Sequence, residues 1–385
     1  MTDKKLFYGR HNLEESDISA VQEAMQSGWL TNGPKTKEFE EKFSQFSRSK
    51  YSVALSSGTA GLHLCALSMA HLHRDTDKKV ITTPLTFVGT AAAFIHSGYT
   101  VDFVDIDPDT NNIDLNFLED KLKFSPKNTF AGVVPVHFAG LPIDVERLSY
   151  LAKKYSLWVI EDASHSYGAE YQSKGGEWYR IGDSTHSKAT IFSMHPVKHI
   201  TSGEGGVVTT NDEKVADTLR LLRNHSIDKS NIIKDWEYDI SVLGFNYRLS
   251  EMQAAFALSQ LARLDNFIDR RRQLAKNYDY AFKDLFVKCP LSAPNYKHTY
   301  HLYVIQVKER DELFQFLKDK NIICQIHYVP IHTFSYFRTN GFENASYPNT
   351  EKYYQECISL PLYPDLSDED QSRVIQAVKT FYQKH

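Results

Sequence analysis

The sequence contains little cysteine. Its 385 residues include four cysteines, which lie far apart at Cys65, Cys289, Cys324 and Cys357. They form no CxxC pair and no dense spacing, so a disulfide framework and a cysteine-based zinc site are both excluded. The chain has 16 histidines, but its close histidine pairs lack a carboxylate or cysteine at metal-ligand spacing. We expect reduced, mostly buried thiols and no metal site.

Long apolar runs and an excess of charge of one sign are also missing. No stretch approaches the ~20 apolar residues that a membrane helix needs. The first ten residues are charged and aromatic, unlike a secretory signal. The 44 basic and 48 acidic side chains leave a net charge of −4, which argues against a nucleic-acid or membrane partner. We therefore expect a cytoplasmic protein that binds a small molecule or another protein.

The length of 385 residues suffices for roughly two to three domains. In the first two-thirds, short runs rich in Val, Ile and Phe alternate with amphipathic segments, a pattern typical of a mostly parallel sheet with helices on both faces. The predicted strands are 51–55, 80–83, 101–105, 132–136, 158–161, 189–192 and 206–209. Helices are predicted between them, at 86–96, 114–122 and 145–155 among others. This pattern predicts a large α/β domain, residues 1–249, with one seven-stranded sheet.

The pattern changes at residue 250. One long helical stretch, 250–282, is predicted to lead out of the large domain. A strand at 300–307, a helix at 311–318, a strand at 322–327 and a last helix after Ser367 follow. Ser367 and Asp370 have the spacing of a capping box, which marks the start of that last helix. Residues 250–385 are therefore predicted to form a connecting helix and a small α+β domain.

Three motifs follow predicted strands, at the edge of the sheet where open α/β folds bind ligands. Ser56-Ser57-Gly58-Thr59-Ala60-Gly61 opens a helix, whose free backbone N–H groups can bind phosphate. Glu161-Asp162-Ala163-Ser164-His165 supplies a carboxylate. Phe192-Ser193-Met194-His195-Pro196-Val197-Lys198, followed by Ser202-Gly203-Glu204-Gly205-Gly206, supplies an amine before a glycine-rich turn. Taken singly, each motif has a more ordinary interpretation. The first is typical of a capped helix, the second of an N-cap carboxylate and the third of a solvated lysine.

Taken together, a phosphate cradle, a carboxylate and an amine are the parts needed to hold pyridoxal phosphate (PLP). The amine forms a Schiff base, and the carboxylate keeps the pyridine nitrogen protonated. A unit charge pair at ~4 Å with an effective dielectric constant of ~20 contributes ~4 kcal/mol, which raises the pKa of that nitrogen by about three. Lysine suits the first role because its amine shifts its pKa readily and forms imines with carbonyls.

The chain resembles the DegT/DnrJ/EryC1/StrS sugar aminotransferases, which have the fold type I (aspartate aminotransferase-like) fold of PLP-dependent transferases. The resemblance covers essentially the whole chain. Besides the three motifs above, it includes Leu30-Thr31-Asn32-Gly33 and the very specific Gly244-Phe245-Asn246-Tyr247-Arg248-Leu249-Ser250-Glu251. It implies a PLP-dependent aminotransferase.

The resemblance also implies roles for the matching residues. Lys198 would form the Schiff base, Asp162 would pair with the ring nitrogen, and His165 would act beside them against the ring. The implied cofactor-binding set is Ser57, Gly58, Thr59, Ala60, Phe87, Asp162, His165, Ser193, Lys198 and Asn246. Because Asn246 would reach the phosphate in a neighbouring subunit, the resemblance implies a homodimer with shared active sites.

Within the family, the chain resembles members that act in pseudaminic acid biosynthesis. This resemblance rests on Asn224-His225-Ser226, on Gln325-Ile326-His327-Tyr328-Val329-Pro330-Ile331 and on the lysine motif. It implies L-glutamate as amino donor, and C4 of a UDP-linked 4-keto-6-deoxy-N-acetylhexosamine (UDP-2-acetamido-2,6-dideoxy-β-L-arabino-hexos-4-ulose) as acceptor. The implied substrate-binding set is Tyr8, Gly28, Trp29, Leu30, Thr31, Gly58, Ser193, Gln325, Ile326, His327 and Tyr328.

Two other functions remain open from the sequence. A sister aminotransferase could act on another nucleotide-linked keto sugar, of the bacillosamine, perosamine or aminoarabinose type, because pocket shape decides the substrate. A catalytically silent member could bind PLP or a nucleotide sugar as a regulator, although Asp162, Lys198 and Asn246 are all present. The polar loop 175–188 is interpreted either as a shield for the site or as cover for a dimer edge.

Overall fold

The computed structural model describes residues 4–230 and 233–384, and its largest element is a seven-stranded sheet. The strand order is β2 (Tyr51–Leu55), β10 (Gly206–Thr210), β9 (Ala189–Ser193), β6 (Trp158–Asp162), β5 (Phe130–Val133), β3 (Lys79–Thr82) and β4 (Thr100–Phe103). β10 is antiparallel to both of its neighbours, and the other pairs are parallel. The predicted fold class, a mostly parallel seven-stranded α/β domain, is confirmed.

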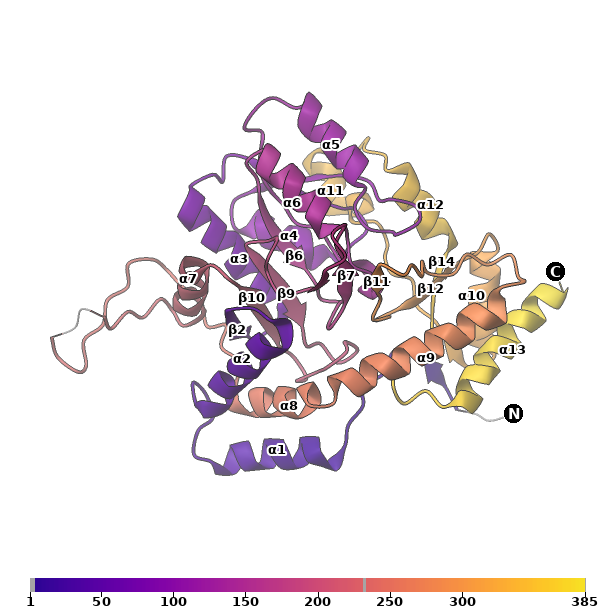
Figure 1. Ribbon diagram of the computed structural model, residues 1–385, viewed down its shortest axis with the longest axis horizontal. Coiled ribbons are helices and arrows are strands. Elements are labelled where there is room, and N and C mark those ends of the chain that lie inside the picture. Colours follow the sequence, from indigo (N-terminus) through magenta and orange to yellow (C-terminus); the bar gives the residue numbers. More distant parts are fainter. Residues whose placement is uncertain (1–3, 231–232, 385) are drawn as a thin grey trace.

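Helices cover both faces of this sheet, because alternate residues of each strand point to opposite sides. Ala54 and Val207 enter one core with α2 (Pro34–Ser47), α5 (Leu115–Phe124) and α6 (Val145–Lys154). Their neighbours Val53 and Val208 enter a second core with α3 (Gly58–His73), α4 (Val88–His96) and α7 (Glu213–Arg223). The sheet is therefore buried between two helical layers (Figure 1).

The single helix predicted over 250–282 is wrong, because the structure divides it into α8 (Glu251–Leu261) and α9 (Leu264–Phe282). The break lies at Arg263, whose backbone leaves helical geometry at φ −108° and ψ 1°. The Arg263 side chain forms ion pairs with Glu14 and Asp17 of the N-terminal segment. There α1 (Glu15–Gln26) packs against α8 (Figure 1). These tertiary contacts stabilise a turn that helical periodicity does not show.

The C-terminal part contains β12 (Tyr303–Gln306), antiparallel to β14 (Cys357–Leu360), with α10 (Arg310–Asp319), α12 (Pro348–Glu356) and α13 (Asp368–Lys384). The strand predicted at 300–307 is shorter, because Arg271 binds the carbonyl groups of Tyr300 and His301. The strand predicted at 322–327 is reduced to β13 (Ile322–Ile323), which pairs with β1 (Leu6–Phe7). The start predicted for the last helix is confirmed, because Ser367 Oγ accepts a hydrogen bond from the Asp370 N–H at 3.0 Å.

α9 runs from the large sheet to the C-terminal part (Figure 1). Its first residues, together with α8, join the core of the large sheet, and its later residues pack beside α10 and α13. The division of the chain at residues 249 and 250 stays a prediction.

The remaining elements are short. β7 (Glu170–Gln172), β8 (Trp178–Arg180) and β11 (Tyr296–Lys297) form a small sheet, so part of the loop 175–188 is a strand. The other short elements are η1 (Phe138–Gly140), η2 (Ile331–Thr333), α11 (Ser335–Phe337) and η3 (Arg338–Phe342). All four thiols are free and three of them are buried, as predicted. Among the described residues, no helix combines the length and the apolar character that crossing a membrane requires.

Candidate active site

Loops that follow β2, β3, β5, β6 and β9 surround a cavity of about 370 Å³. Because the carboxyl ends of these strands meet at one edge of the sheet, motifs far apart in the sequence become neighbours. The predicted residues that line the cavity are Tyr8, Ser57, Gly58, Thr59, Phe87, Asp162, His165, Ser193, Lys198, His327 and Tyr328.

The other predicted residues do not line this cavity in the single chain. Ala60 is buried in the first turn of α3. The segment Gly28, Trp29, Leu30 and Thr31 is exposed after α1, and Gln325 and Asn246 are exposed as well. Ile326 packs beside the C-terminal core. The roles assigned to these residues stay predictions.

The cavity also contains residues that the sequence reasoning did not select. These are Thr86, Thr90, Ser164, His195, Glu204 and His301, among others. Ser164, His195 and Glu204 lie inside the motifs quoted above, so they could have been chosen. His301 comes from the segment just before β12, and nothing in its local sequence points to this site.

The carboxylate of Asp162 is buried and held from two sides. Its Oδ2 accepts a hydrogen bond of 2.7 Å from Thr90 Oγ1, and its Oδ1 accepts one of 2.6 Å from Ser164 Oγ. The preceding Glu161 points to the other face of the sheet, where it lies 2.7 Å from His137 Nε2. Burial opposes the ionisation of Glu161, but the contact with His137 lowers the pKa of that carboxyl. Asp162 is therefore the member of the pair that faces the cavity.

Lys198 lies after β9, in the loop that begins with Ser193. Its backbone N–H donates to the carbonyl of His195 at 2.9 Å, which forms a tight turn. Burial lowers the pKa of Lys198 to about 8, and the charge of Asp162 opposes that shift. A lowered pKa increases the fraction of neutral amine, the form that attacks a carbonyl group.

His165 is buried, and its hydrogen bonds define its tautomer. Its Nδ1 accepts a hydrogen bond of 3.3 Å from the Ala139 N–H, so the ring proton must be on Nε2. Nε2 lies 3.0 Å from the hydroxyl oxygen of Tyr328. Burial lowers the pKa of His165 well below its ordinary value, and the charge of Lys198 acts in the same direction. A neutral His165 thus donates to Tyr328 and leaves the Tyr328 proton free for an acceptor in the cavity.

The start of α3 forms the opposite wall. Ser57 is the N-cap, and its Oγ accepts a hydrogen bond of 3.0 Å from the Ala60 N–H. A Cβ atom at Gly58 would lie 2.8 Å from Ser193 Cβ, so only glycine lets these two loops approach so closely. The N–H groups of the first helical turn have no acceptor within the helix and can bind an anion.

These residues fit PLP. The first turn of α3 offers N–H groups for its phosphate, the buried Asp162 offers a carboxylate for its ring nitrogen, and Lys198 offers an amine for its aldehyde. Ser57, Gly58 and Thr59 at this helix start line the cavity, and a Cβ atom at Gly58 would clash with Ser193 beside it.

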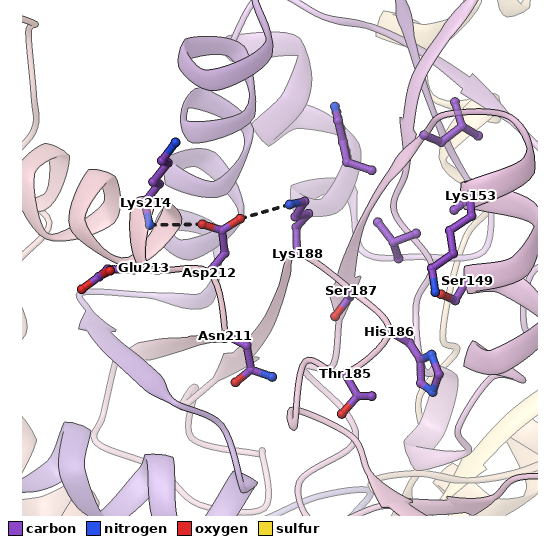
Figure 2. Close-up of a pocket in the computed structure, with 14 residues that line it drawn as sticks. Ser149, Lys153, Thr185, His186, Ser187, Lys188, Asn211, Asp212, Glu213 and Lys214 are labelled. Atoms are coloured by element: carbon purple, nitrogen blue, oxygen red, sulfur yellow. Dashed lines mark hydrogen bonds and ion pairs between the residues drawn. The ribbon is translucent and has the colours of Figure 1, made fainter.

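A second, wider hollow of about 690 Å³ lies at the opposite edge of the sheet (Figure 2). Residues 185–188 line it, so this part of the loop 175–188 lies away from Lys198. There Asp212 pairs with Lys188 Nζ at 3.0 Å and accepts from the Lys214 N–H at 3.1 Å. The start of α7 and Lys188 therefore already bind a carboxylate of the chain itself, that of Asp212.

Most of the chain matches a known protein family. Residues 11–379 match the DegT/DnrJ/EryC1/StrS aminotransferase family. The chain is 38% identical over 381 residues to the Bacillus subtilis spore coat polysaccharide biosynthesis protein SpsC. The alignment covers 95% of this chain and 94% of SpsC.

Two solved structures are similar over their whole length. Helicobacter pylori PseC, an aminotransferase involved in the biosynthesis of pseudoaminic acid, has a TM-score of 0.91 at 31% identity, covering 99% of this chain and 100% of PseC. Streptococcus pneumoniae Spr1654 in its PLP-form has a TM-score of 0.88 at 26% identity, covering 99% of each chain.

Proposed function

The chain belongs to the DegT/DnrJ/EryC1/StrS aminotransferase family, and from this premise we propose that it transfers the amino group of L-glutamate to C4 of a UDP-linked 4-keto-6-deoxy-N-acetylhexosamine. It is a PLP-dependent sugar aminotransferase. The observation that carries the proposal is that Lys198, Asp162 and the start of α3 face one cavity.

The chain's own residues have distinct tasks in this reaction. When bound, PLP supplies an aldehyde that carries the amino group and a protonated ring that withdraws electrons. The Asp162 carboxylate, oriented by Thr90 and Ser164, stabilises the proton on the ring nitrogen. The first turn of α3 binds the phosphate.

Lys198 has two tasks. Its amine binds the cofactor at rest, and once released it accepts a proton at Nζ and returns it during each half-reaction. The lowered pKa supports this assignment, because a base must be partly neutral near pH 7. His165 acts beside it as a neutral donor that fixes the Tyr328 hydroxyl.

The polar aromatic wall of the cavity supports a sugar substrate. Tyr8 and His327 have ring centroids 5.0 Å apart, and Phe87 and Tyr328 have ring centroids 6.4 Å apart. Burial lowers the pKa of His327 to about 3, so its imidazole is neutral. Such flat faces with hydroxyl and imidazole groups suit a nucleotide sugar.

We also propose that the enzyme is a homodimer with shared active sites. The described residues between α7 and α8, which are 224–230 and 233–250, extend away from the body of the molecule (Figure 1). Their exposed apolar side chains include Trp236, 75% exposed, and Leu243, 84% exposed. Such an arm is unfavourable in water unless a second subunit covers it. Asn246, close to its end, is the residue predicted to reach the partner's cofactor.

The function can be tested optically. The PLP-loaded protein is first converted to its pyridoxamine form with L-glutamate, which removes the yellow absorbance. After the donor is removed, the UDP-linked 4-keto sugar is added. We expect the yellow absorbance to return with formation of the 4-amino sugar.

The outcomes separate the alternatives. If the yellow absorbance does not return with this sugar but returns with another 4-keto nucleotide sugar, the enzyme belongs to a sister pathway. The similarity to SpsC, a polysaccharide biosynthesis protein, favours that second candidate. No response to glutamate or to other amino donors would contradict transamination and support a silent binding protein.

A further inference from the structure

Lys198 borders two separate cavities. One is the candidate active site, and the other is a small, partly open space of about 10 Å³ that is lined by other residues of the same loop. The second space is lined by Pro196, His199 and Thr201 of the lysine loop, by Arg271 of α9 and by Asn12, among others. Among the described residues, Lys198 alone lines both cavities. A space of this size accommodates one water molecule when polar groups surround it.

Two residues that line this small cavity each have a buried polar atom without a partner. Arg271 is 1% exposed and His199 is 2% exposed. Within the described part of the chain, neither Arg271 Nε nor His199 Nδ1 has a hydrogen-bond partner. Arg271 uses its Nη1 to donate to the carbonyl oxygens of Tyr300, His301 and Leu362, so its Nε–H remains available. Buried polar atoms without partners are unfavourable and rare.

The two atoms are complementary. His199 Nε2 lies 3.0 Å from the carbonyl oxygen of Thr299, which can only accept, so the ring proton is on Nε2. Burial lowers the pKa of His199 well below its ordinary value, and the charge of Arg271 acts in the same direction, so the ring is neutral. Nδ1 is therefore an acceptor, whereas Arg271 Nε–H is a donor. One water can accept a hydrogen bond from Arg271 Nε–H and donate one to His199 Nδ1.

We propose that this cavity is a hydration site, in which one ordered water accepts a hydrogen bond from Arg271 Nε and donates one to His199 Nδ1. Through this bridge His199 becomes a positioning residue for the adjacent Lys198. The hydration site stands independently of the reaction, whereas the positioning role rests on the proposed function of Lys198.

The place of Arg271 in the fold explains why such a bridge would matter. Phe267 and Ile268 of α9 pack into the core of the large sheet, whereas Leu274 and Tyr278 pack into the C-terminal core. Arg271 lies between these two groups on the same helix. The water therefore connects the loop that bears Lys198 to the helix that joins both cores.

The first test is a high-resolution crystal structure of the PLP-loaded wild-type enzyme. We expect one water peak within hydrogen-bond distance of Arg271 Nε and His199 Nδ1. An empty cavity, or a direct contact between these side chains, would overturn the hydration site. This readout requires no knowledge of the sugar substrate, so it can succeed even if the proposed reaction is wrong.

The second test separates the two hydrogen bonds of His199. In His199→Asn the amide can occupy the place of Nδ1 and accept from the water, whereas in His199→Gln the amide can occupy the place of Nε2 and donate to Thr299. We expect His199→Asn to keep the wild-type kcat and the wild-type absorbance maximum of the lysine-bound cofactor. His199→Gln should lower kcat about tenfold, because small misplacements of a reacting group are costly. It should also shift that absorbance while leaving KM unchanged.

If His199→Gln kept the wild-type kcat and His199→Asn lowered it, the positioning role would be overturned, because only the contact with Thr299 would matter. Equal activity of both variants and wild type would overturn it as well. If either variant fails to fold, the wild-type crystal structure still decides whether the water is present.

Discussion

Thr90 Oγ1 donates a hydrogen bond of 2.7 Å to Asp162 Oδ2 and thereby connects the first turn of α4 to the last residue of β6. The Thr90 oxygen lies 2.8 Å from Thr86 Oγ1, which can donate to it in turn. A chain of two hydroxyl groups therefore orients the buried carboxylate from one side, and Ser164 holds the other oxygen. In the proposed enzyme this orientation aims Asp162 at the cofactor.

Thr90→Val should weaken PLP binding about tenfold, because a hydrogen bond to a charged group contributes about 1.5–3 kcal/mol. Titration of the apoenzyme with PLP, followed by absorbance, measures the change. Thr218→Val is the matched control, since Thr218 is partly exposed and its hydroxyl donates to the Lys214 carbonyl within α7, away from the candidate site. Unchanged affinity in Thr90→Val would show that Asp162 does not depend on this bond.

Lys198→Ala should abolish turnover and the absorbance of the lysine-bound cofactor, because no other described lysine lines that cavity. Lys188→Ala is the control. Lys188 pairs with Asp212 at the opposite edge of the sheet (Figure 2), and such a partly exposed pair contributes about 0–1 kcal/mol. Steady-state assays of both variants make the comparison. Turnover near the wild-type rate in Lys198→Ala would refute the assignment of this lysine.

The contribution of Lys198 to the stability of the apoenzyme should become more favourable as the pH rises from about 8 to 10.5. Burial lowers the pKa of Lys198 from 10.5 to about 8, so in this window the unfolded chain binds more protons than the folded one. Below pH 8 Lys198 is protonated in both the folded and the unfolded chain, so the cost of burying its charge is fully present. Because other groups also titrate, the measured quantity is the difference in Tm between wild type and Lys198→Met as a function of pH. A difference that stays constant across this window would contradict the lowered pKa.

Leu243→Glu should give a monomer with little activity, because it places a charge on the apolar arm that we assign to the subunit interface. Light scattering coupled to gel filtration reports the mass. Phe286→Glu is the control, since Phe286 is 95% exposed but lies outside the arm, just after α9. A Leu243→Glu dimer as stable as the wild type would place the interface elsewhere.

Gly132→Ala should destabilise the large sheet by about 3 kcal/mol, as expected for an overpacked core. A Cβ atom at Gly132 in β5 would lie 2.0 Å from Cε3 of the Trp158 ring in β6. Gly175→Ala is the control, because the nearest atom there, Ser173 Oγ, is 3.6 Å from the added carbon. Urea denaturation of the two variants measures the difference. Equal midpoints would mean that Trp158 moves aside without cost.

The positions of the seven strands along the chain and the family motifs could be read from the sequence, whereas the order of the strands in the sheet could not. Short β-branched runs show the buried strands because both faces of a parallel sheet are covered, and this local signal does not depend on distant contacts. In contrast, the break at Arg263 follows from its ion pairs with Glu14 and Asp17, which are far away in the sequence. Helical periodicity continues through that break, so the pattern alone predicts one helix.

The sequence by itself determined the α/β class, the family and three of the loops that form the candidate site. Their motifs depend on local backbone geometry, namely a helix start, a strand end and a glycine-rich turn. The family resemblance implied Asp162 as the carboxylate of the site, but only the tertiary structure showed the physical reason: adjacent strand residues point to opposite sides, so Asp162 faces the cavity while Glu161 faces His137. It also brought Thr90, His301 and Tyr328 to Lys198, because such contacts form only when separate elements pack together.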